Sequence, residues 1–157
     1  MPNWCDNSFE VSHKDPAMIK RFADAFKRGE LCAEFIPLPD GEWNWDFCVE
    51  NWGTKWDVGG DDGYINEDEP NFVSGSFQSA WSPPMGLFPV LEELGYTIRF
   101  MYYEPGMNFA GVYMDGYDDC YELAETADEV EKQIPEELDE AFCIVENKRQ
   151  WEEENEE

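Results

Sequence analysis

The order of the predicted secondary-structure elements is the feature that most constrains the fold of this chain. The clearest element is a helix that Asp15 caps and Gly29 ends, and Pro16 suits its first turn. Apolar residues recur along it at helical spacing: Met18, Ile19, Phe22, Ala23, Ala25 and Phe26. A second helix is predicted to start after Ser82 and to end near Leu94. The two helices lie far apart in the chain, so the strands around them decide the fold.

Alternating polar and apolar residues predict four strands, over residues 4–11, 72–80, 96–103 and 109–114. Residues 31–60 hold several Pro and Gly residues, and we expect there a short helix that breaks at Gly53 and enters a further strand. Residues 61–70 are expected to form an acidic loop. The resulting order is strand, helix, strand, strand, helix, strand, with one strand added. It predicts an α+β fold, a ferredoxin-like split βαβ sandwich whose antiparallel sheet carries helices on one face.

The chain has 157 residues, a length that favours one folded domain with its own core. We expect residues 1–117 to form the ferredoxin-like domain, and residues 118–157 to form an acidic C-terminal helical extension packed on it. Its last residues, from Trp151, are expected to be frayed. Residues 122–157 carry 15 acidic and 3 basic side chains, and Pro135 interrupts their helical pattern. Apolar side chains are expected to dock this extension: Val130, Ile134, Leu138, Phe142 and Val145.

The charge of the chain excludes several classes of protein. It has 37 Asp and Glu against 10 Lys and Arg, a formal net charge of −27. Acidic disordered chains lack aromatic residues, whereas this one has 7 Trp, 7 Tyr and 11 Phe, so we expect it to fold. The negative charge argues against direct binding of nucleic acid or of an anionic membrane, because both need clustered basic residues.

Two further patterns bear on the cellular compartment. No stretch approaches about 18 consecutive apolar residues, and no signal-peptide pattern begins the chain, so we expect a cytoplasmic protein. The five cysteines are odd in number, widely spaced and never in a CxxC pair. They are therefore expected to be buried, reduced thiols and not a disulfide frame or a zinc site.

Five short motifs follow one another between residues 1 and 115: MPNWCDN, IPLP, ENWGTKWD, SAWSPP and YYEPGMNFAG. In these motifs the chain resembles the YubB ferredoxin-like domain family, which is found in phage and plasmid proteins. The resemblance implies a ferredoxin-like fold and an origin in a mobile genetic element. It implies no settled biochemical activity, and it does not account for the acidic segment after residue 117.

The motif residues form a candidate ligand pocket: Trp52, Lys55, Trp56, Trp81 and Glu104. They lie close together if the strands that bear the motifs are neighbours. On the functional interpretation, Lys55 and Glu104 orient a small ligand or peptide while the tryptophans supply contact area. On the structural interpretation, which we favour, Lys55 and Glu104 form an internal pair over the tryptophan faces, a cation–π arrangement that fixes loops.

Catalytic patterns are weak, and we assign no catalytic residue, no metal ligand and no cofactor. His13 is the one histidine and nothing around it suggests a nucleophilic triad. Two acidic runs contain the oxygen ligands that hard cations prefer, without the spacing of a calcium loop: Asp61, Asp62, Asn66 and Asp68, and Asp115, Asp118 and Asp119. No glycine-rich phosphate loop occurs. A metal-dependent hydrolase is kept only as a minor alternative.

The charge instead suggests a partner that itself binds nucleic acid. A compact chain of this length is roughly 40 Å across, and B-DNA of that length carries about 23 phosphate charges, close to the net charge here. We therefore expect a phage- or plasmid-encoded nucleic-acid mimic that blocks a basic host nuclease, restriction, CRISPR or recombination protein. High acidity that merely keeps the protein in solution is the main alternative, and a homo-oligomer stays open.

Ten carboxylates are the expected partner-binding residues: Asp40, Glu42, Asp46, Asp61, Asp62, Glu67, Asp68, Glu69, Asp118 and Asp119. The expected contact surface comprises the loops of residues 40–70 and the C-terminal acidic segment. It is expected to face away from a basic helix, on or beside which half of the basic residues lie: Lys14, Lys20, Arg21, Lys27 and Arg28. The alternative function is a small-ligand or peptide-binding domain that uses the motif pocket without catalysis.

Overall fold

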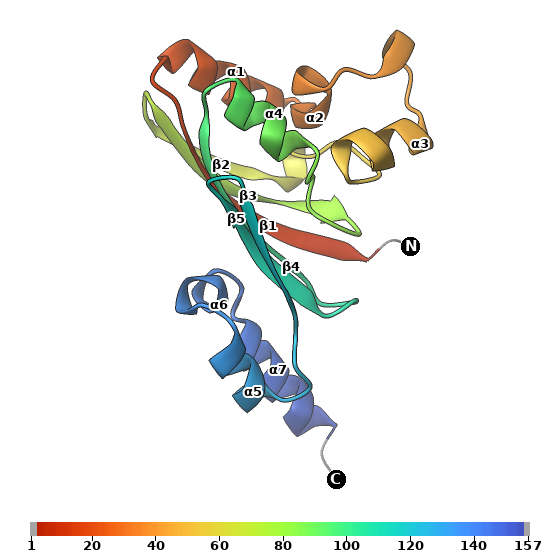
Figure 1. The fold of residues 1–157 in the computed structure, drawn as a ribbon, viewed down its shortest axis with the longest axis vertical. Helices are drawn as coiled ribbons and strands as arrows, with labels where there is room; N and C mark the ends of the chain where they lie inside the picture. Colours follow the sequence, from red (N-terminus) through yellow and green to blue (C-terminus); the bar gives the residue numbers. More distant parts are fainter. Residues whose placement is uncertain (1–2, 156–157) are drawn as a thin grey trace.

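The computed structural model describes residues 3–155 and has a mixed α+β fold built on one antiparallel sheet (Figure 1). Six strands lie in the order β2-β3-β1-β4-β5-β6, and each pairs antiparallel with its neighbours. Their bounds are β1 Trp4–Ser12, β2 Tyr64–Glu69, β3 Phe72–Ala80, β4 Thr97–Glu104, β5 Phe109–Met114 and β6 Tyr117–Glu122. The antiparallel α+β architecture predicted from the order of elements is confirmed.

Seven α-helices occur in the described chain: α1 Pro16–Lys27, α2 Leu31–Phe35, α3 Trp45–Phe47, α4 Leu87–Glu93, α5 Ala127–Gln133, α6 Glu136–Phe142 and α7 Ile144–Glu154. Short helical turns also occur at η1 Pro39–Gly41, η2 Cys48–Trp52 and η3 Gly60–Asp62. The first long helix begins as predicted, because the Asp15 side chain accepts a hydrogen bond from the backbone N–H of Ala17 and Pro16 opens the helix. None of these helices combines the length and the apolar character needed to cross a bilayer.

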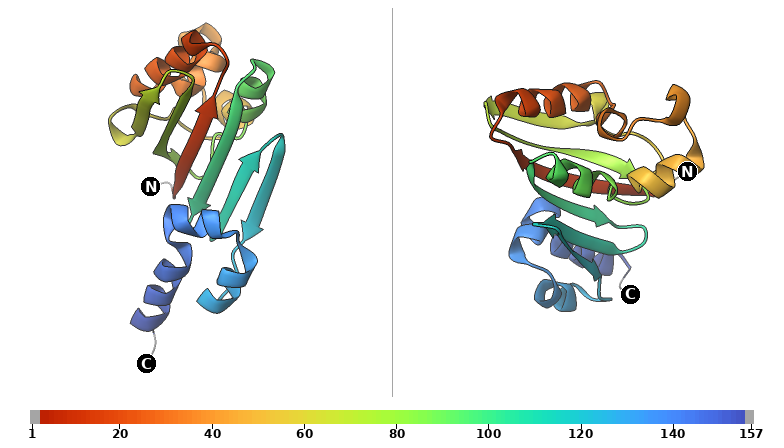
Figure 2. Two further views of the ribbon diagram at one scale, coloured as in Figure 1. Left: turned by 90° about the vertical axis from the view of Figure 1, so that its left-hand side faces the viewer. Right: turned by 45° about the horizontal axis from the view of Figure 1, so that its top comes forward.

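Helices cover both faces of the sheet, at different strands (Figures 1 and 2). Helices α1, α2 and α4 bury one core, in which Phe9 and Phe100 contact helix side chains. Helices α5, α6 and α7 pack against β4 and β5 on the other face, through a second core around Leu138 and Ala110. Helices α1 and α4 share one face, whereas the helices of the C-terminal extension, whose face was not predicted, cover the other face at β4 and β5. Phe100 and Met101 are consecutive and both apolar, so both faces of β4 need cover.

The acidic loop predicted over residues 61–70 is instead η3 followed by strand β2. Strand β2 lies at an edge of the sheet, where its carboxylates reach solvent, and its register with β3 shifts between Asn66 and Glu69. The strand expected directly after Gly53 does not form, since residues 54–59 are irregular.

The predicted boundary between residues 117 and 118 falls at the start of β6, which pairs with β5 along its whole length. The acidic extension therefore begins inside the sheet, and its three helices follow after β6. The predicted break at Pro135 is confirmed, because α5 ends before it and α6 starts after it. The expected frayed end is helical up to Glu154, and residues 156–157 lie outside the described chain.

Candidate functional site

The ENWGTKWD and SAWSPP motifs lie against each other, as the predicted pocket requires. The Thr54 hydroxyl donates to the carbonyl of Ala80 at 2.9 Å, and the backbone N–H of Gly86 donates to the carbonyl of Trp52 at 3.1 Å. Between them, Gly53 has a φ of +81°, a left-handed conformation that glycine adopts without strain. The motifs therefore form one hydrogen-bonded unit that joins the chain before β2 to the end of β3.

Two of the five predicted pocket residues serve the fold. Trp52 is buried in the main core, and its indole N–H donates to the carbonyl of Ile36 at 2.9 Å. Glu104 is fully buried, and its two carboxylate oxygens accept the backbone N–H groups of Gly106 at 2.7 Å and Met107 at 2.6 Å. Glu104 thus holds the β4–β5 turn. The ion pairs found within residues 3–155 do not include one between Lys55 and Glu104.

The other three predicted residues lie together at the surface. The Lys55 ammonium is 4.5 Å from the ring centroid of Trp56 and 5.3 Å from that of Trp81. The expected cation–π arrangement is therefore present, without its carboxylate. Two more tryptophans join it: Trp4 lies 5.9 Å from Trp56 between ring centroids, and the Trp43 indole donates to the carbonyl of Lys55 at 3.1 Å.

We refer to Trp4, Trp43, Trp56 and Trp81 as the tryptophan cluster. Each of these side chains is between 38% and 51% exposed, although tryptophan is the largest apolar residue. Exposed aromatic groups gathered on one surface are typical of binding sites, where tryptophan often carries much of the affinity. Trp4 and Trp43 are not among the predicted pocket residues, although the position of Trp4 in the first motif was a signal for it.

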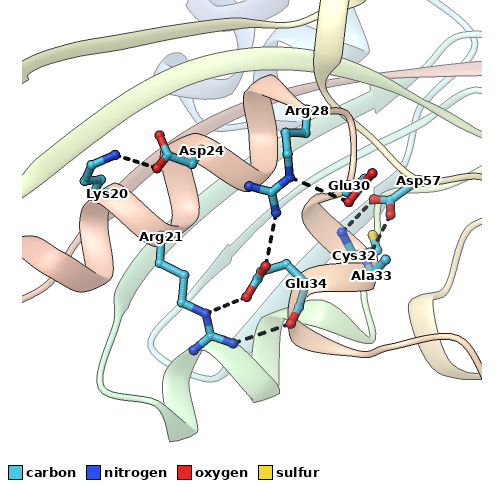
Figure 3. Close-up of polar contacts among 9 residues, drawn as sticks. All are labelled: Lys20, Arg21, Asp24, Arg28, Glu30, Cys32, Ala33, Glu34 and Asp57. Carbon is cyan, nitrogen blue, oxygen red and sulfur yellow. Dashed lines mark hydrogen bonds and ion pairs between the residues drawn. The ribbon is translucent and has the colours of Figure 1, made fainter. Parts of the chain in front are cut away.

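A cavity of about 400 Å³ opens beside this cluster, lined by Trp4, Trp56, Asp57, Asp62 and Gln78 among others. Asp57, the last residue of its motif, accepts the backbone N–H groups of Cys32 at 2.6 Å and Ala33 at 2.9 Å (Figure 3). It thereby caps the start of α2, whose own first residues supply no side-chain cap. Burial raises the pKa of the Asp57 carboxyl, and those backbone hydrogen bonds partly oppose the shift.

A larger groove of about 900 Å³ lies between the sheet and α7. Asp6 on β1 and Tyr103 on β4, which are directly opposite in the strand register, contribute its floor. Lys148, Trp151 and Glu152 of α7 are among its other lining residues. Burial raises the pKa of the Tyr103 hydroxyl, because it disfavours the charged phenolate.

All ten predicted partner-binding carboxylates are exposed. They form three groups: Asp40, Glu42 and Asp46 around η1 and α3; Asp61, Asp62, Glu67, Asp68 and Glu69 on η3 and β2; and Asp118 and Asp119 on β6. Strands β2 and β6 are the two opposite edges of the sheet. The acidic groups therefore do not make one compact patch.

The basic residues of α1 are engaged by carboxylates (Figure 3). The ammonium of Lys20 lies 2.6 Å from a carboxylate oxygen of Asp24, and Arg21 and Arg28 both pair with Glu34. Lys27 pairs with Glu67 of β2. The expectation that the acidic residues face away from the basic helix is therefore wrong for Glu67, because β2 runs beside α1.

Two features considered for catalysis are a metal cluster and the histidine His13. Within residues 3–155, no three His, Cys, Asp or Glu side chains are grouped as they would be around a metal ion. The His13 ring is held in its turn, since its Nδ1 accepts the backbone N–H of Asp15 and its Nε2 lies 2.9 Å from the carbonyl of Leu94.

All five cysteines are free thiols. The expectation that they are buried holds for three of them, and burial raises the pKa of the Cys5 thiol to about 12. It is wrong for Cys120 and Cys143, which are exposed. Cys120 lies on the edge strand β6, and Cys143 lies at the junction of α6 and α7.

The sequence and the structure were compared with those of known proteins. No protein-family model matches the sequence, and no curated protein matches it. Among solved structures, the chain is similar to the crystal structure of a protein api92 from Yersinia pseudotuberculosis, which is described under the family DUF1281. The two share 25% identity at a TM-score of 0.39, over 49% of this chain and 29% of that one. The chain thus spans less than a third of that protein's length.

Proposed function

We propose that this protein is a phage- or plasmid-encoded acidic binding protein that mimics nucleic acid and blocks a basic host defence protein. The partner would be a nuclease, restriction, CRISPR or recombination protein of the host cytoplasm. The observation that carries the proposal is the row of exposed carboxylates along each edge strand of the sheet. On this proposal the protein acts by binding, with no cofactor and no catalytic step.

The placement of charge along the edges supports mimicry. Glu67, Asp68 and Glu69 are consecutive in β2, where residues rise about 3.4 Å each and successive side chains point to opposite faces. One strand of B-DNA carries one phosphate per about 3.4 Å of helix axis, so each face of β2 carries roughly half that density of charge. Asp118 and Asp119 line the opposite edge, five strand spacings or roughly 24 Å away. Two separated rows of negative charge are what a basic protein meets on a duplex.

Internal ion pairs leave the negative charge at these edges largely uncompensated. Six of the ten basic residues are paired with carboxylates: Lys20, Arg21, Lys27, Arg28, Arg99 and Arg149. Among the edge carboxylates, Asp68, Glu69, Asp118 and Asp119 take no part in the ion pairs formed within residues 3–155. Their charge is therefore available to attract a basic partner.

The proposed fold family is the ferredoxin-like sandwich, and with it the YubB-like origin in a mobile element. The strand order β2-β3-β1-β4, with α1 between β1 and β2 and α4 between β3 and β4, supports the split βαβ arrangement. Strands β5 and β6 and helices α5 to α7 would then be additions at one edge of it.

Capture from host lysate tests the proposal. The immobilised protein is exposed to lysate at low salt, and duplex DNA is then used for elution. We expect basic nucleic-acid-binding proteins to be retained and released by DNA, because DNA competes for the same site. Retention of no such protein at low salt, or retention that DNA does not reverse, would contradict mimicry.

Charge reversal identifies the surface. The variant Asp61→Lys, Asp62→Lys, Asp68→Lys and Glu69→Lys should no longer bind the captured partner. It leaves Glu67 unchanged, because a lysine at that position would lie against Lys27. The matched control reverses four exposed carboxylates of α5 to α7: Glu129, Glu136, Glu140 and Glu146. Equal loss in both variants would show that total charge, and not the β2 edge, attracts the partner.

A second candidate function rests on the tryptophan cluster. Its exposed indoles and the adjoining cavity of about 400 Å³ favour a small-ligand or peptide-binding domain. Tryptophan fluorescence, followed during titration with nucleotides, metabolites and short peptides, tests it. A ligand that shifts the emission supports this function, and a library without any response removes it.

A further inference from the structure

We propose that an extended arginine- or lysine-rich segment of the partner binds along the open face of the sheet, from one cavity to the other, and we call this path the trough. The trough comprises the cavity at Trp4 and Trp56, the row formed by Gln78 and Asp6, and the groove beside α7. This inference rests on the proposed function, because it names the part of a basic partner that makes the central contact.

The strand register places lining residues of the two cavities side by side. Gln78 on β3, Asp6 on β1 and Tyr103 on β4 are directly opposite one another, so their side chains share one face of the sheet. The Gln78 amide donates to an Asp6 carboxylate oxygen at 3.0 Å. Gln78 lines the smaller cavity, whereas Asp6 and Tyr103 line the larger groove. The three strands span two spacings, about 10 Å, a length that three extended residues cover.

The face around this row is open and polar. Helices α5 to α7 pack on β4 and β5, while Ser8 and Glu10 of β1 and Ser76 of β3 lie on the same face and are half-buried or exposed. An incoming peptide therefore meets hydroxyl, amide and carboxylate groups that can accept hydrogen bonds from its backbone and side chains.

The charges along the trough fit a cationic occupant. Two ammonium groups lie in or beside it, that of Lys148 in the lining and that of Lys55 over Trp56, against five lining carboxylates: Asp6, Asp57, Asp62, Glu125 and Glu152. The Asp57 and Glu152 carboxylates also accept backbone N–H groups, so the Asp6, Asp62 and Glu125 carboxylates are the freest to meet guanidinium or ammonium groups. A carboxylate pairs with guanidinium in a bidentate geometry, which favours arginine over lysine.

Aromatic rings stand at both ends of the trough. Trp4 and Trp56 flank one end, and Tyr103 and Trp151 line the other. A tryptophan face attracts a guanidinium or ammonium group within about 6 Å of its centroid. Lys55 occupies such a position over Trp56, so the chain itself shows that the Trp56 indole accepts a cation. The aromatic ends and the acidic centre together suit an extended segment with several cationic side chains.

Titration of a fluorescently labelled hexa-arginine peptide, followed by anisotropy, tests the trough. We expect Asp6→Asn and Asp62→Asn each to weaken binding about three- to fivefold, since each removes one close charge partner. The matched control is Glu140→Gln, which removes one negative charge from an exposed position of α6 and is expected to change the affinity less than about twofold. Trp151→Ala should weaken binding about fivefold, and Tyr117→Ala, an exposed aromatic of β6, should leave it unchanged.

The outcomes separate this inference from the proposed function. Equal weakening by Asp6→Asn, Asp62→Asn and Glu140→Gln would overturn the trough, because the peptide would then respond only to overall charge, and it would leave the capture experiment with the partner to decide the proposed function. A peptide that does not bind at low salt would overturn both. Circular dichroism and thermal unfolding of each variant exclude a fold defect, and Trp151→Phe, which keeps an aromatic ring, should restore most of the affinity lost in Trp151→Ala.

Discussion

Glu104 shows how a buried charge in a motif can serve the fold alone. Its two carboxylate oxygens hold the N–H groups of Gly106 and Met107 in the β4–β5 turn. Gly106 suits this position, because a Cβ there would lie 2.8 Å from a Glu104 carboxylate oxygen. At the scale of single residues, the YYEPGMNFAG motif is thus explained by a turn and its carboxylate cap.

Replacement of Glu104 tests that role. Glu104→Ala should lower the free energy of unfolding by about 2 kcal/mol, because two backbone donors lose a charged acceptor. Glu104→Gln, which keeps one acceptor oxygen, should lower it less. Denaturant unfolding measures both, with Glu93→Ala at an exposed position of α4 as the control. A variant Glu104→Ala as stable as Glu93→Ala would contradict the structural role and return Glu104 to the candidate ligand residues.

A second test at this scale concerns the ion pairs of α1. The hydrogen bond from Lys20 lowers the pKa of the Asp24 carboxyl below its ordinary 3.8. A carboxyl whose pKa is lowered by folding stabilises the protein above its ordinary pKa and loses that contribution as the pH falls through the lowered value. Lys20→Gln should therefore raise the pKa of Asp24 toward 3.8 in an NMR titration.

Lys14→Gln provides the control for that titration, because Lys14 also lies beside α1 but does not contribute to the Asp24 shift. It should leave the pKa of Asp24 in place. An Asp24 pKa that is the same in Lys20→Gln and in the unmodified protein would show that the pair does not form in solution.

At the scale of elements, the two edge strands decide how the sheet can associate with other molecules. Strand β2 presents Glu67, Asp68 and Glu69 to solvent, and a register shift interrupts its pairing with β3. Charged residues and irregular pairing on an edge strand hinder its association with the edge of another molecule. The same carboxylates that are proposed to mimic phosphates would then also keep the protein from self-association.

Neutral β-forming residues at this edge should therefore promote self-association. We expect Asp68→Thr combined with Glu69→Thr to shift the protein toward dimers or larger species at high concentration, as measured by light scattering after size-exclusion chromatography. The charge-matched control is Glu140→Gln with Glu146→Gln, at exposed positions of α6 and α7. If both double variants associate to the same extent, lost charge alone is responsible and the edge geometry is not.

The elements that sequence analysis predicted well are those with local signals. Asp15 and Pro16 mark the start of α1, and the alternation of Val73 and Phe77 with polar residues marks β3, whose predicted bounds match the structure. Strands β2 and β6 were missed because edge strands can carry charge on both faces, which resembles a solvated loop in sequence.

The candidate site was predicted only in part, because some of its residues lie in local motifs and others are brought together by the fold. Lys55, Trp56 and Trp81 were found because the motifs that hold them are conspicuous, and they lie together as expected. Trp4 was missed because it is 52 residues from Trp56 in the chain, and only the pairing of β1 with β3 brings it there. The partner of Glu104 depends on the shape of the hairpin, which residue types alone do not specify.

At the scale of the whole molecule, the net charge of −27 is the feature that most affects stability. Carboxylates on both edge strands, η1 and α3 repel one another, and this repulsion destabilises the compact state. Salt screens such exposed charges over a Debye length of about 10 Å at 0.1 M. We therefore expect the melting temperature to rise between roughly 0.02 M and 0.5 M NaCl, although most exposed ion pairs weaken with salt.

Thermal unfolding followed by circular dichroism measures that effect. The variant with Asp61, Asp62, Asp68 and Glu69 reversed to lysine has a smaller net charge, and its melting temperature should depend less on salt. A melting temperature that falls with added NaCl in the unmodified protein would show that ion pairs, and not repulsion, control its stability.

The central claim is that this acidic surface takes the place of nucleic acid on a basic partner. Its most direct test adds the protein to a preformed complex of the captured partner with fluorescently labelled duplex DNA and follows the anisotropy. We predict that the DNA is displaced, that displacement weakens as salt rises, and that the variant with Asp61, Asp62, Asp68 and Glu69 reversed displaces none. Binding of the protein while the DNA stays on the partner, as a ternary complex, would contradict the claim.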